Sequence, residues 1–307
     1  MAYFFHILLS NIVPISIMLG VGVILQRAFK LDIKTLSKLN FYLFSPAVIF
    51  TKLYESTLSM AVLFQVLLFF FLFFALLILA VQIVIWVRGY KGSMASAMRN
   101  SVLFYNSANY AIPLNQLVFS GDPFTLSVQI IIMMMQNIIP NTYGVYSVNA
   151  HKNQLKKTMK TIFSLPAIYA IPLAFILRGF HIEVPDPIYT PIEYVSSGFV
   201  ATALITLGVQ LGSMKWVIQF SDVLISNFLR LCIGPALGFV VIWMLGLQGD
   251  IAKALFLSCA VPTSLSSVLL AVEFDNEPEF ASQAVFSSTM LSMFTMTIVI
   301  YLMQFLP

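Results

Sequence analysis

Charged residues are scarce in this chain. Only 9% of its 307 residues are Asp, Glu, Lys or Arg, whereas 60% are hydrophobic. Soluble globular proteins carry about 25% charged residues, so this scarcity excludes a fold whose surface faces water on all sides. The two cysteines, Cys232 and Cys259, both lie inside apolar stretches. We expect them to be buried thiols that act as small hydrophobic side chains.

Acidic residues and histidines are missing from the interior of the apolar stretches. Every Asp and Glu lies in a loop or at the end of a stretch, and the three histidines are His6, near the N-terminus, and His151 and His181, in loops. An intramembrane enzyme needs a nucleophile with a base, or a metal with its ligands. A proton relay usually needs an acid or a histidine within the membrane. We therefore expect no catalysis, no metal and no cofactor, and the coupling ion stays open.

Long uncharged stretches make up most of the sequence. Nine stretches between successive charges have about 17 residues or more, enough for a helix to cross a bilayer. They are Met1–Gln26, Ser56–Val87, Asn100–Gly121, Pro123–Ala150, Thr161–Leu177, Tyr194–Met214, Leu231–Gly249, Ala254–Val272 and Phe280–Pro307. A tenth, Leu39–Thr51, is long enough only when extended back to Lys34, whose ammonium group then reaches the headgroups. The sequence predicts an all-α polytopic membrane protein with ten transmembrane helices.

Basic residues are distributed unequally between the predicted loops. Twelve Lys and Arg residues fall in the loops after the odd-numbered spans, and three fall in the opposite set. Because basic loops stay in the cytoplasm, this asymmetry predicts that both termini lie outside. It also explains the net charge of +4 without a nucleic-acid partner, since the longest basic run, Lys152–Lys160, is a short loop.

The basic loop at residues 151–160 divides the chain into two halves. Five predicted spans lie in residues 1–150 and five in residues 161–307. Since five is odd, the second half enters the membrane from the opposite side. Transporters built from such inverted repeats bind substrate near the bilayer midplane. We expect an N-terminal five-helix repeat, a cytoplasmic loop and an inverted C-terminal five-helix repeat.

The fourth span of each half is polar and has a proline near its centre. The two polar segments are Tyr105–Leu114, which contains Pro113, and Ser258–Ser267, which contains Pro262. A proline removes one helical hydrogen bond and obstructs another, and in hydrocarbon the freed groups need new partners. Both prolines are either ordinary kinks, or they mark broken helices whose N-terminal ends face a carboxylate. Two breaks in matching places favour the second interpretation.

The candidate substrate-binding residues follow from that interpretation. They are Asn106, Ser107, Asn109, Pro113, Asn137, Asn141, Pro262, Thr263, Ser264 and Ser267. Asn137 and Asn141 share one helical face, where they either contact substrate or hold helices together. With no fixed cation among these residues, we expect weak substrate binding and rapid release.

Arg230 is the one charge embedded in an apolar segment. It either attracts an anion or a cytoplasmic acid, or it extends its guanidinium toward the cytoplasmic headgroups. The position of Arg230 about two turns from the end of its span favours the second interpretation.

Five short motifs along almost the whole chain resemble one family of membrane proteins. They lie in Leu39–Phe50, Asn106–Leu114, Gln136–Gly144, Leu204–Leu211 and Ala260–Phe274. The first is similar to an Asn-x-Phe…Pro…Phe signature, and the second to the sequence Asn-Thr…Gly-Ile-Pro-Leu. These signatures are typical of the auxin efflux carrier family, which includes plant auxin exporters and bacterial permeases associated with malate and malonate.

The resemblance implies a fold and a location. It implies ten helices related to those of the bile-acid sodium symporters, with proline-broken helices 4 and 9 crossing at the centre. It also implies a transport domain that moves against a scaffold, a homodimer formed through that scaffold, and a bacterial inner membrane. Asn106 and the crossing at Pro113 and Pro262 would lie near the bound carboxylate.

The sequence also departs from the family pattern. Ser267 replaces a second proline of the plant members, and Val272 replaces a lysine, so auxin is not supported as the substrate. The sodium symporters have an acidic residue in the broken ninth helix, whereas residues 254–272 contain none. Sodium coupling through that residue is therefore not supported either.

The sequence as a whole predicts a secondary transporter and not an enzyme. We expect it to carry a small organic anion, a mono- or dicarboxylate such as malate or malonate, by alternating access with an elevator-like movement. Its partners are then the substrate, the lipid bilayer and a second copy, without nucleic acid. The alternative is a membrane sensor that binds the same ligand without moving it.

Overall fold

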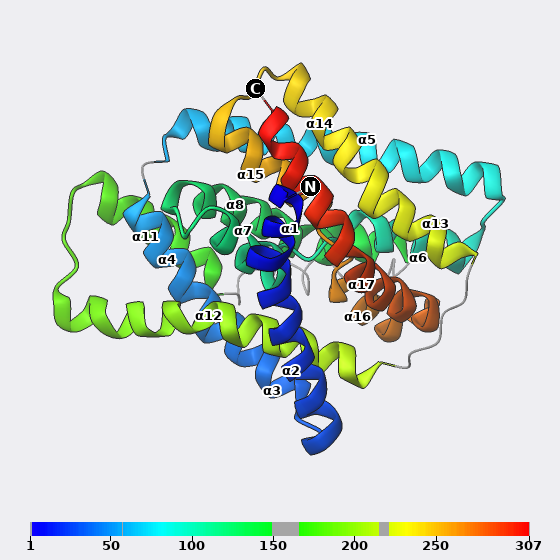
Figure 1. Cartoon of the computed structure of the whole chain (residues 1–307), viewed down its shortest axis with the longest axis horizontal. Coiled ribbons are helices and arrows are strands. Elements are labelled where there is room, and N and C mark those ends of the chain that lie inside the picture. The colour runs from blue at the N-terminus through cyan, green and yellow to red at the C-terminus, as the bar shows by residue number, and fades with distance from the viewer. Residues whose placement is uncertain (1, 57, 149–165, 215–220, 307) are drawn as a thin grey trace.

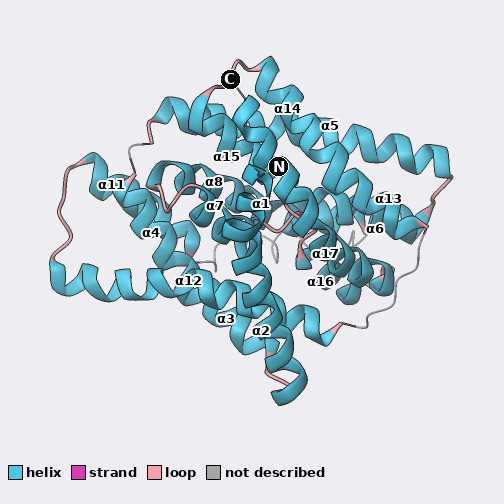
Figure 2. Ribbon diagram, in the orientation of Figure 1, coloured by secondary structure: helices cyan, strands magenta, loops and turns pink. Residues whose placement is uncertain are grey.

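The chain is helical throughout the part that the structure describes (Figures 1 and 2). This computed structural model describes residues 2–56, 58–148, 166–214 and 221–306. Within them, the β-structure consists of one isolated antiparallel bridge between Tyr105 and Thr263. The predicted loop at residues 151–160 lies outside the described residues. The all-α prediction is confirmed for the described ranges.

Among the described residues, six helical segments are long and apolar enough to cross a membrane. They are Phe4–Phe29, Met60–Arg88, Pro123–Gly144, Asp186–Ser213, Asp222–Met244 and Pro278–Phe305. Two of them are single helices, α5 (Met60–Arg88) and α12 (Asp186–Ser213). The other four are made of consecutive elements, namely α1 (Ala2–Ile7), η1 (Leu8–Ile12) and α2 (Val13–Phe29); α8 (Pro123–Ile139) and η4 (Pro140–Gly144); α13 (Asp222–Phe228), η5 (Leu229–Ile233) and α14 (Gly234–Met244); and α17 (Pro278–Leu302) and η6 (Met303–Phe305). The chain is therefore a multi-pass membrane protein.

Helix α5 shows how the sequence sets such a segment. The Ser59 side chain accepts a hydrogen bond from the Val62 N–H and caps the first turn. The next 29 residues, Met60–Arg88, carry no charge before the final arginine. Gly89 then adopts a left-handed conformation with φ of 67°, which ends the helix.

Shorter helices complete the fold. The predicted second segment is helical from Ile33 to Glu55, as α3 (Ile33–Leu39), η2 (Asn40–Phe44) and α4 (Ser45–Glu55). Two pairs are interrupted. α6 (Gly92–Leu103) is followed, after Phe104–Asn106, by η3 (Ser107–Ala111) and α7 (Ile112–Val118), and α15 (Gly249–Ala260) is followed, after Val261–Ser264, by α16 (Leu265–Glu273). The other two helices in the described ranges are α9 (Val145–Ser147) and α11 (Ala167–Gly179).

Prolines are accommodated by wide π-helical turns. Each of η1, η2, η3 and η5 runs directly into an α-helix that has a proline in its first two positions, namely Pro14, Pro46, Pro113 and Pro235. A π-turn relieves the clash between the proline ring and the preceding turn. Pro113 therefore lies inside a continuing helix. Our prediction that it marks the first break is wrong, since the chain breaks upstream at Phe104–Asn106.

The helices form two groups, which lie side by side in Figure 1. α2 packs along α12, and α4 packs against α11 and α12. These helices and α3 are called the scaffold group. α14 packs on α5 and α15, α13 on α17, and α8 on α5 and α15. These helices and α6, α7, α9 and α16, together with the π-turns η3, η4 and η5, are called the crossing group.

Long-range hydrogen bonds between side chains mostly stay within one group. In the scaffold group, the Asn40 amide donates to the Thr206 hydroxyl at 2.7 Å. In the crossing group, the hydroxyls of Ser101 and Ser226 are 2.7 Å apart, and the Ser147 hydroxyl donates to an oxygen of Asn100 at 2.7 Å. Each group is therefore internally tied by polar contacts.

Two glycines allow α2 and α12 to approach closely. A Cβ atom on Gly22 would lie 2.4 Å from the Ile205 carbonyl oxygen and 2.8 Å from the Gly208 Cα, whereas a Cβ on Gly20 would meet nothing within 4 Å. Small residues of this kind let membrane helices pack backbone to backbone. Gly22 therefore fixes the distance between the two long helices of the scaffold group.

We expect Gly22→Ala to destabilise the protein and Gly20→Ala to leave it nearly unchanged. The added methyl group at residue 22 must push the two backbones apart, at a cost of about 1–3 kcal/mol. Thermal unfolding of the purified variants in detergent measures the difference. Equal melting temperatures for the two variants would contradict this account of the helix contact.

Candidate functional site

The two helix breaks meet and pair with each other at the centre of the crossing group. The Asn106 N–H donates to the Pro262 carbonyl, and the Ser264 N–H donates to the Phe104 carbonyl, both at 2.8 Å. These bonds form the isolated antiparallel bridge. Backbone groups in an apolar interior must find partners inside the protein. Each break therefore supplies hydrogen-bond partners for backbone groups that the other break leaves without a helical partner.

Side chains satisfy further backbone groups at the breaks. The Gln136 side chain serves two, because its Oε1 accepts from the Tyr105 N–H at 3.1 Å and its Nε2 donates to the Leu103 carbonyl at 3.3 Å. The Thr263 hydroxyl donates to the Ser101 carbonyl at 2.8 Å. Gln136 and Thr263 thus hold the break geometry.

Arg230 binds the C-terminal ends of both interrupted helices. Its Nη1 donates to the Val102 carbonyl at 3.2 Å, and its Nη2 donates to the Cys259 carbonyl. The fully buried guanidinium lies 4.6 Å from the centre of the Tyr105 ring and 5.9 Å from that of Phe73. The expectation that Arg230 extends toward the headgroups is wrong. Helix-end carbonyls and aromatic faces stabilise its charge inside the protein.

The N-terminal ends of the resumed helices lie at the other side of the crossing. Asn106 begins the first, and its side-chain oxygen accepts from the Asn109 N–H at 3.1 Å. Ser264 begins the second, and its hydroxyl oxygen accepts from the Ser266 N–H at 3.3 Å. Helix N-termini carry partial positive charge and favour anions. The crossing therefore has a negative side, which Arg230 neutralises, and a positive side.

A cavity of about 330 Å³ lies at this positive side. It is bounded by both breaks, by α3 of the scaffold group, by α8 and by the end of α12. Five of the ten predicted residues line it, namely Asn106, Ser107, Asn109, Asn137 and Ser264. Four do not line this cavity, namely Pro113, Pro262, Thr263 and Ser267. Asn141 is in η4, and its side chain is outside what the structure describes.

Two lysines line the same cavity and were missed by the sequence reasoning. Lys34 and Lys38 lie one turn apart on α3, and both are exposed. Asp32 caps this helix, and hydrogen bonds from the Thr35 hydroxyl and the Lys34 N–H lower the pKa of its carboxyl. No acidic side chain is among the described residues that line the cavity. The predicted site residues include no cation, and the cavity adds these two lysines at its rim.

Two buried polar atoms at the cavity have no hydrogen-bond partner within the described protein. They are the Ser107 hydroxyl oxygen and the Gln210 side-chain carbonyl oxygen. The Ser107 and Gln210 residues are 2% and 4% exposed. Buried polar atoms are normally satisfied, so each of these two atoms is available for a hydrogen bond from a ligand or water in the cavity. Gln210, on α12, was not predicted, because its neighbours in sequence are apolar.

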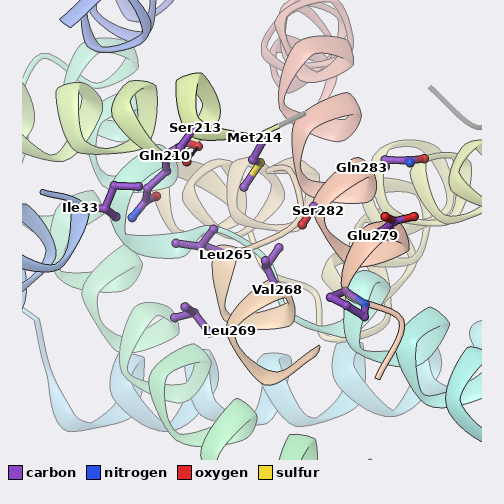
Figure 3. Close-up of a pocket in the computed structure, with 11 residues that line it drawn as sticks. Ile33, Gln210, Ser213, Met214, Leu265, Val268, Leu269, Glu279, Ser282 and Gln283 are labelled. Atoms are coloured by element: carbon purple, nitrogen blue, oxygen red, sulfur yellow. Dashed lines mark hydrogen bonds between the residues drawn. The ribbon is translucent and has the colours of Figure 1, made fainter. Parts of the chain in front are cut away.

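A second cavity of about 560 Å³ adjoins the first and shares Ile33, Gln210, Leu265 and Leu269 with it. Figure 3 shows it between the end of α12, the start of α16 and the start of α17, with Glu279 on its far side. The two cavities are therefore adjacent along these shared residues. The second cavity extends from the crossing to the first residues of α3 and α17.

Taken together, a multi-pass helical protein with a polar cavity at two interrupted helices has the features of a membrane transporter. The sequence matches the family model described as "Membrane transport protein" over residues 8–300. The chain belongs to this family, the auxin efflux carrier family.

Relatives support the assignment at lower coverage. The chain is 27% identical over 128 residues to auxin efflux carrier component 5 of Arabidopsis thaliana. The matched region covers 41% of the chain and 36% of that protein. It is 26% identical over 153 residues to component 8 from the same plant, covering 48% of the chain and 41% of that protein. It is 26% identical over 138 residues to an uncharacterized transporter of Methanothermobacter thermautotrophicus, covering 45% of each. The chain thus matches less than half the length of these relatives.

We expect Gln136→Met to destabilise the crossing. The substitution leaves the Tyr105 N–H and the Leu103 carbonyl without partners, and each unsatisfied group costs about 1–3 kcal/mol. The loss in stability from the two groups together should therefore be about 2–6 kcal/mol, measured by thermal unfolding.

The matched control is Gln129→Met, on the same helix. Both polar atoms of the buried Gln129 side chain lack a hydrogen-bond partner in the described protein. Replacing them with apolar atoms should be neutral or stabilising. If both variants lose the same stability, Gln136 does not hold the breaks in the way described.

Proposed function

We propose that this protein is a secondary transporter of a small organic anion, a mono- or dicarboxylate of the size of malate or malonate. The observation that supports it is the lining of the 330 Å³ cavity. Two helix N-termini and neutral amides and hydroxyls face a space whose rim carries Lys34 and Lys38. Such groups bind a carboxylate through hydrogen bonds and dipoles without a tight ion pair. This arrangement allows release as well as binding.

The opposite end of the interface between the groups is closed by packing. Val48, Ile49 and Leu53 of α4 share an apolar cluster with Ile112 and Ile130 of the crossing group. A cavity on one side of the crossing and tight packing on the other are what alternating access requires of one state. If the basic loops are cytoplasmic, the cavity opens to the cytoplasm.

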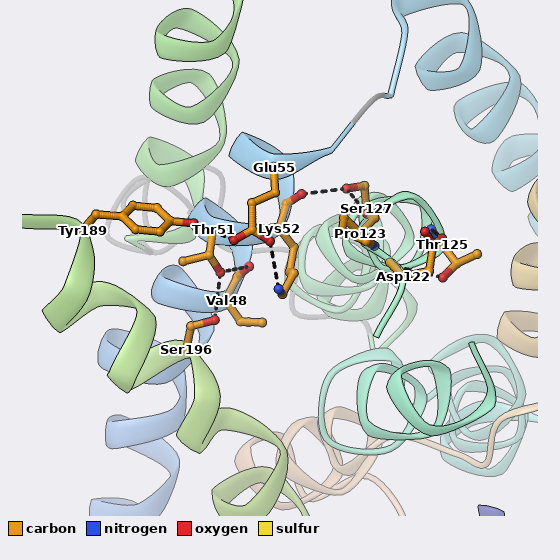
Figure 4. Close-up of polar contacts among 10 residues, drawn as sticks. All are labelled: Val48, Thr51, Lys52, Glu55, Asp122, Pro123, Thr125, Ser127, Tyr189 and Ser196. Atoms are coloured by element: carbon orange, nitrogen blue, oxygen red, sulfur yellow. Dashed lines mark hydrogen bonds and ion pairs between the residues drawn. The ribbon is translucent and has the colours of Figure 1, made fainter. Parts of the chain in front are cut away.

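Polar contacts mark the closed end (Figure 4). The Ser127 hydroxyl of α8 donates to the Lys52 carbonyl of α4 at 3.2 Å and so joins the two groups. Lys52 also forms an ion pair with Glu55 at 2.9 Å, and the Tyr189 hydroxyl donates to Glu55 at 2.6 Å. These last contacts stay within the scaffold group. Few bonds would have to break for the groups to slide past one another.

The movement we propose is elevator-like, with the crossing group carrying the substrate along the scaffold group. The internal hydrogen bonds of each group and the apolar contact between them support it. The ten-helix inverted repeat belongs to the same proposal, and two interrupted helices, one in each half, support it. We also propose an inner-membrane location with both termini outside, which the charge distribution supports. A homodimer through the scaffold group rests on the family resemblance.

Uptake of labelled malate, malonate and related acids into proteoliposomes tests the proposal, and Asn106→Asp sharpens it. The variant keeps the oxygen that caps the Asn109 N–H but places a negative charge in the cavity. Two like charges 4 Å apart repel by roughly 4 kcal/mol in a protein. We therefore expect wild-type uptake to be saturable and accelerated by substrate on the other side, and the variant to lose at least about 10-fold.

The control for this variant is its melting temperature, which should stay near that of the wild type. Undiminished transport by a folded Asn106→Asp protein would refute the proposed site. Ligand binding by wild-type protein without any uptake would instead favour the sensor.

We expect Lys34→Gln and Lys38→Gln each to raise the KM for a dicarboxylate by about 2–5-fold, because exposed charge pairs contribute up to about 1 kcal/mol. The effect should shrink at high salt, since the Debye length falls. Lys30→Gln is the control, because Lys30 is exposed nearby but does not line the cavity. An equal rise of KM in all three variants would show general surface attraction and no role for the cavity rim.

A further inference from the structure

Arg230 is the one charged residue that is fully buried among the described residues. The other described charged residues of the crossing group, such as Arg99, Asp222 and Lys253, are at least partly exposed. Arg230 also takes part in none of the ion pairs between described residues. The guanidinium keeps its proton in proteins. A net positive charge therefore resides permanently in the middle of the crossing group.

Every contact described for this charge comes from the same group. The carbonyl acceptors belong to Val102 on α6 and Cys259 on α15, and the rings belong to Phe73 on α5 and Tyr105 at the first break. Gly234, one turn further along, lets the guanidinium fit, since a Cβ there would lie 3.0 Å from Nη2. The charge is thus fixed to the crossing group and would move with it.

The cavity and the Arg230 guanidinium have Tyr105 as a shared neighbour. The Tyr105 residue lines the cavity, while the Arg230 guanidinium sits 4.6 Å from the centre of its ring. Arg230 does not line the cavity. A bound carboxylate and this guanidinium would therefore travel together without forming an ion pair.

We propose that Arg230 is a built-in counter-charge that neutralises a monovalent substrate during the movement of the loaded carrier. This inference rests on the proposed transport function. The loaded crossing group then carries no net buried charge with a monoanion and one negative charge with a dianion. The empty group carries one positive charge on its return. The resident arginine thereby takes over part of the electrical role of a coupling cation.

The size of the effect follows from the membrane potential. A unit charge that crosses the full field changes its distribution between the two sides about 50-fold per 100 mV. A partial crossing gives a smaller but measurable factor. A neutral complex gives no change, so voltage dependence reports the net charge that moves.

Exchange of labelled for unlabelled substrate isolates the loaded step, because the empty carrier does not need to return. We would use a dicarboxylate for which uptake is saturable and its monoamide, so that the two substrates are a dianion and a monoanion. Proteoliposomes would be clamped at 0 and 100 mV with potassium and valinomycin. We expect wild-type exchange of the monoanion to be insensitive to voltage and that of the dianion to vary several-fold.

Two variants separate charge from hydrogen bonding. Arg230→Lys and Arg230→Gln both lose the forked contact with Val102 and Cys259, but only the second loses the charge. We expect monoanion exchange to stay insensitive to voltage in Arg230→Lys and to become voltage-dependent in Arg230→Gln. Lys253→Gln, which removes a partly exposed charge in the second turn of α15, should behave like the wild type.

The outcomes are distinguishable. No saturable uptake of any carboxylate would contradict the transport function itself. Robust uptake with voltage-dependent exchange of the monoanion by the wild type would overturn the counter-charge while leaving transport intact. If Arg230→Gln does not fold, the wild-type comparison of monoanion with dianion still decides, since equal voltage dependence for both would refute the inference.

Discussion

The pairing of two interrupted backbones is the constraint on which this structure depends. An apolar interior offers no water to a broken helix, so every freed N–H and carbonyl must find a partner in the protein. The breaks at Phe104–Asn106 and Val261–Ser264 solve this by bonding to each other, and the side chains of Gln136, Thr263 and Ser288 supply further hydrogen bonds. Because each break requires the other, the two halves of the chain are locked together at this point.

That pairing also sorts the helix ends by charge. The C-terminal ends of α6 and α15 converge on Arg230, and the N-terminal ends of η3 and α16 converge on the cavity. The Arg230 guanidinium thus stabilises the negative helix ends on one side of the crossing, while the positive helix ends on the other side remain available to an anion. The same arrangement explains how a charge can be fully buried without an acidic partner.

The prolines show where sequence reasoning succeeded and where it failed. The polar segments around Pro113 and Pro262 correctly indicated that both helices are interrupted. Pro262 lies in its break, but Pro113 lies in a helix that a π-turn has widened to accept it. A proline excludes a regular α-helical turn. It does not determine whether the helix widens into a π-turn or is interrupted. The sequence pattern alone cannot separate these outcomes.

The composition and the long uncharged stretches between charges by themselves determined that the chain is an all-helical membrane protein. A chain with 60% hydrophobic residues and few charges can be solvated only by lipid. Local polarity also pointed to Asn106, Asn109 and Ser264, which line the cavity, because hydroxyls and amides are costly in a membrane without partners. Only the tertiary structure decided that Lys34, Lys38 and Gln210 face the same cavity and that Arg230 is enclosed. These positions depend on which distant helices pack together, and no spacing along one chain segment encodes that.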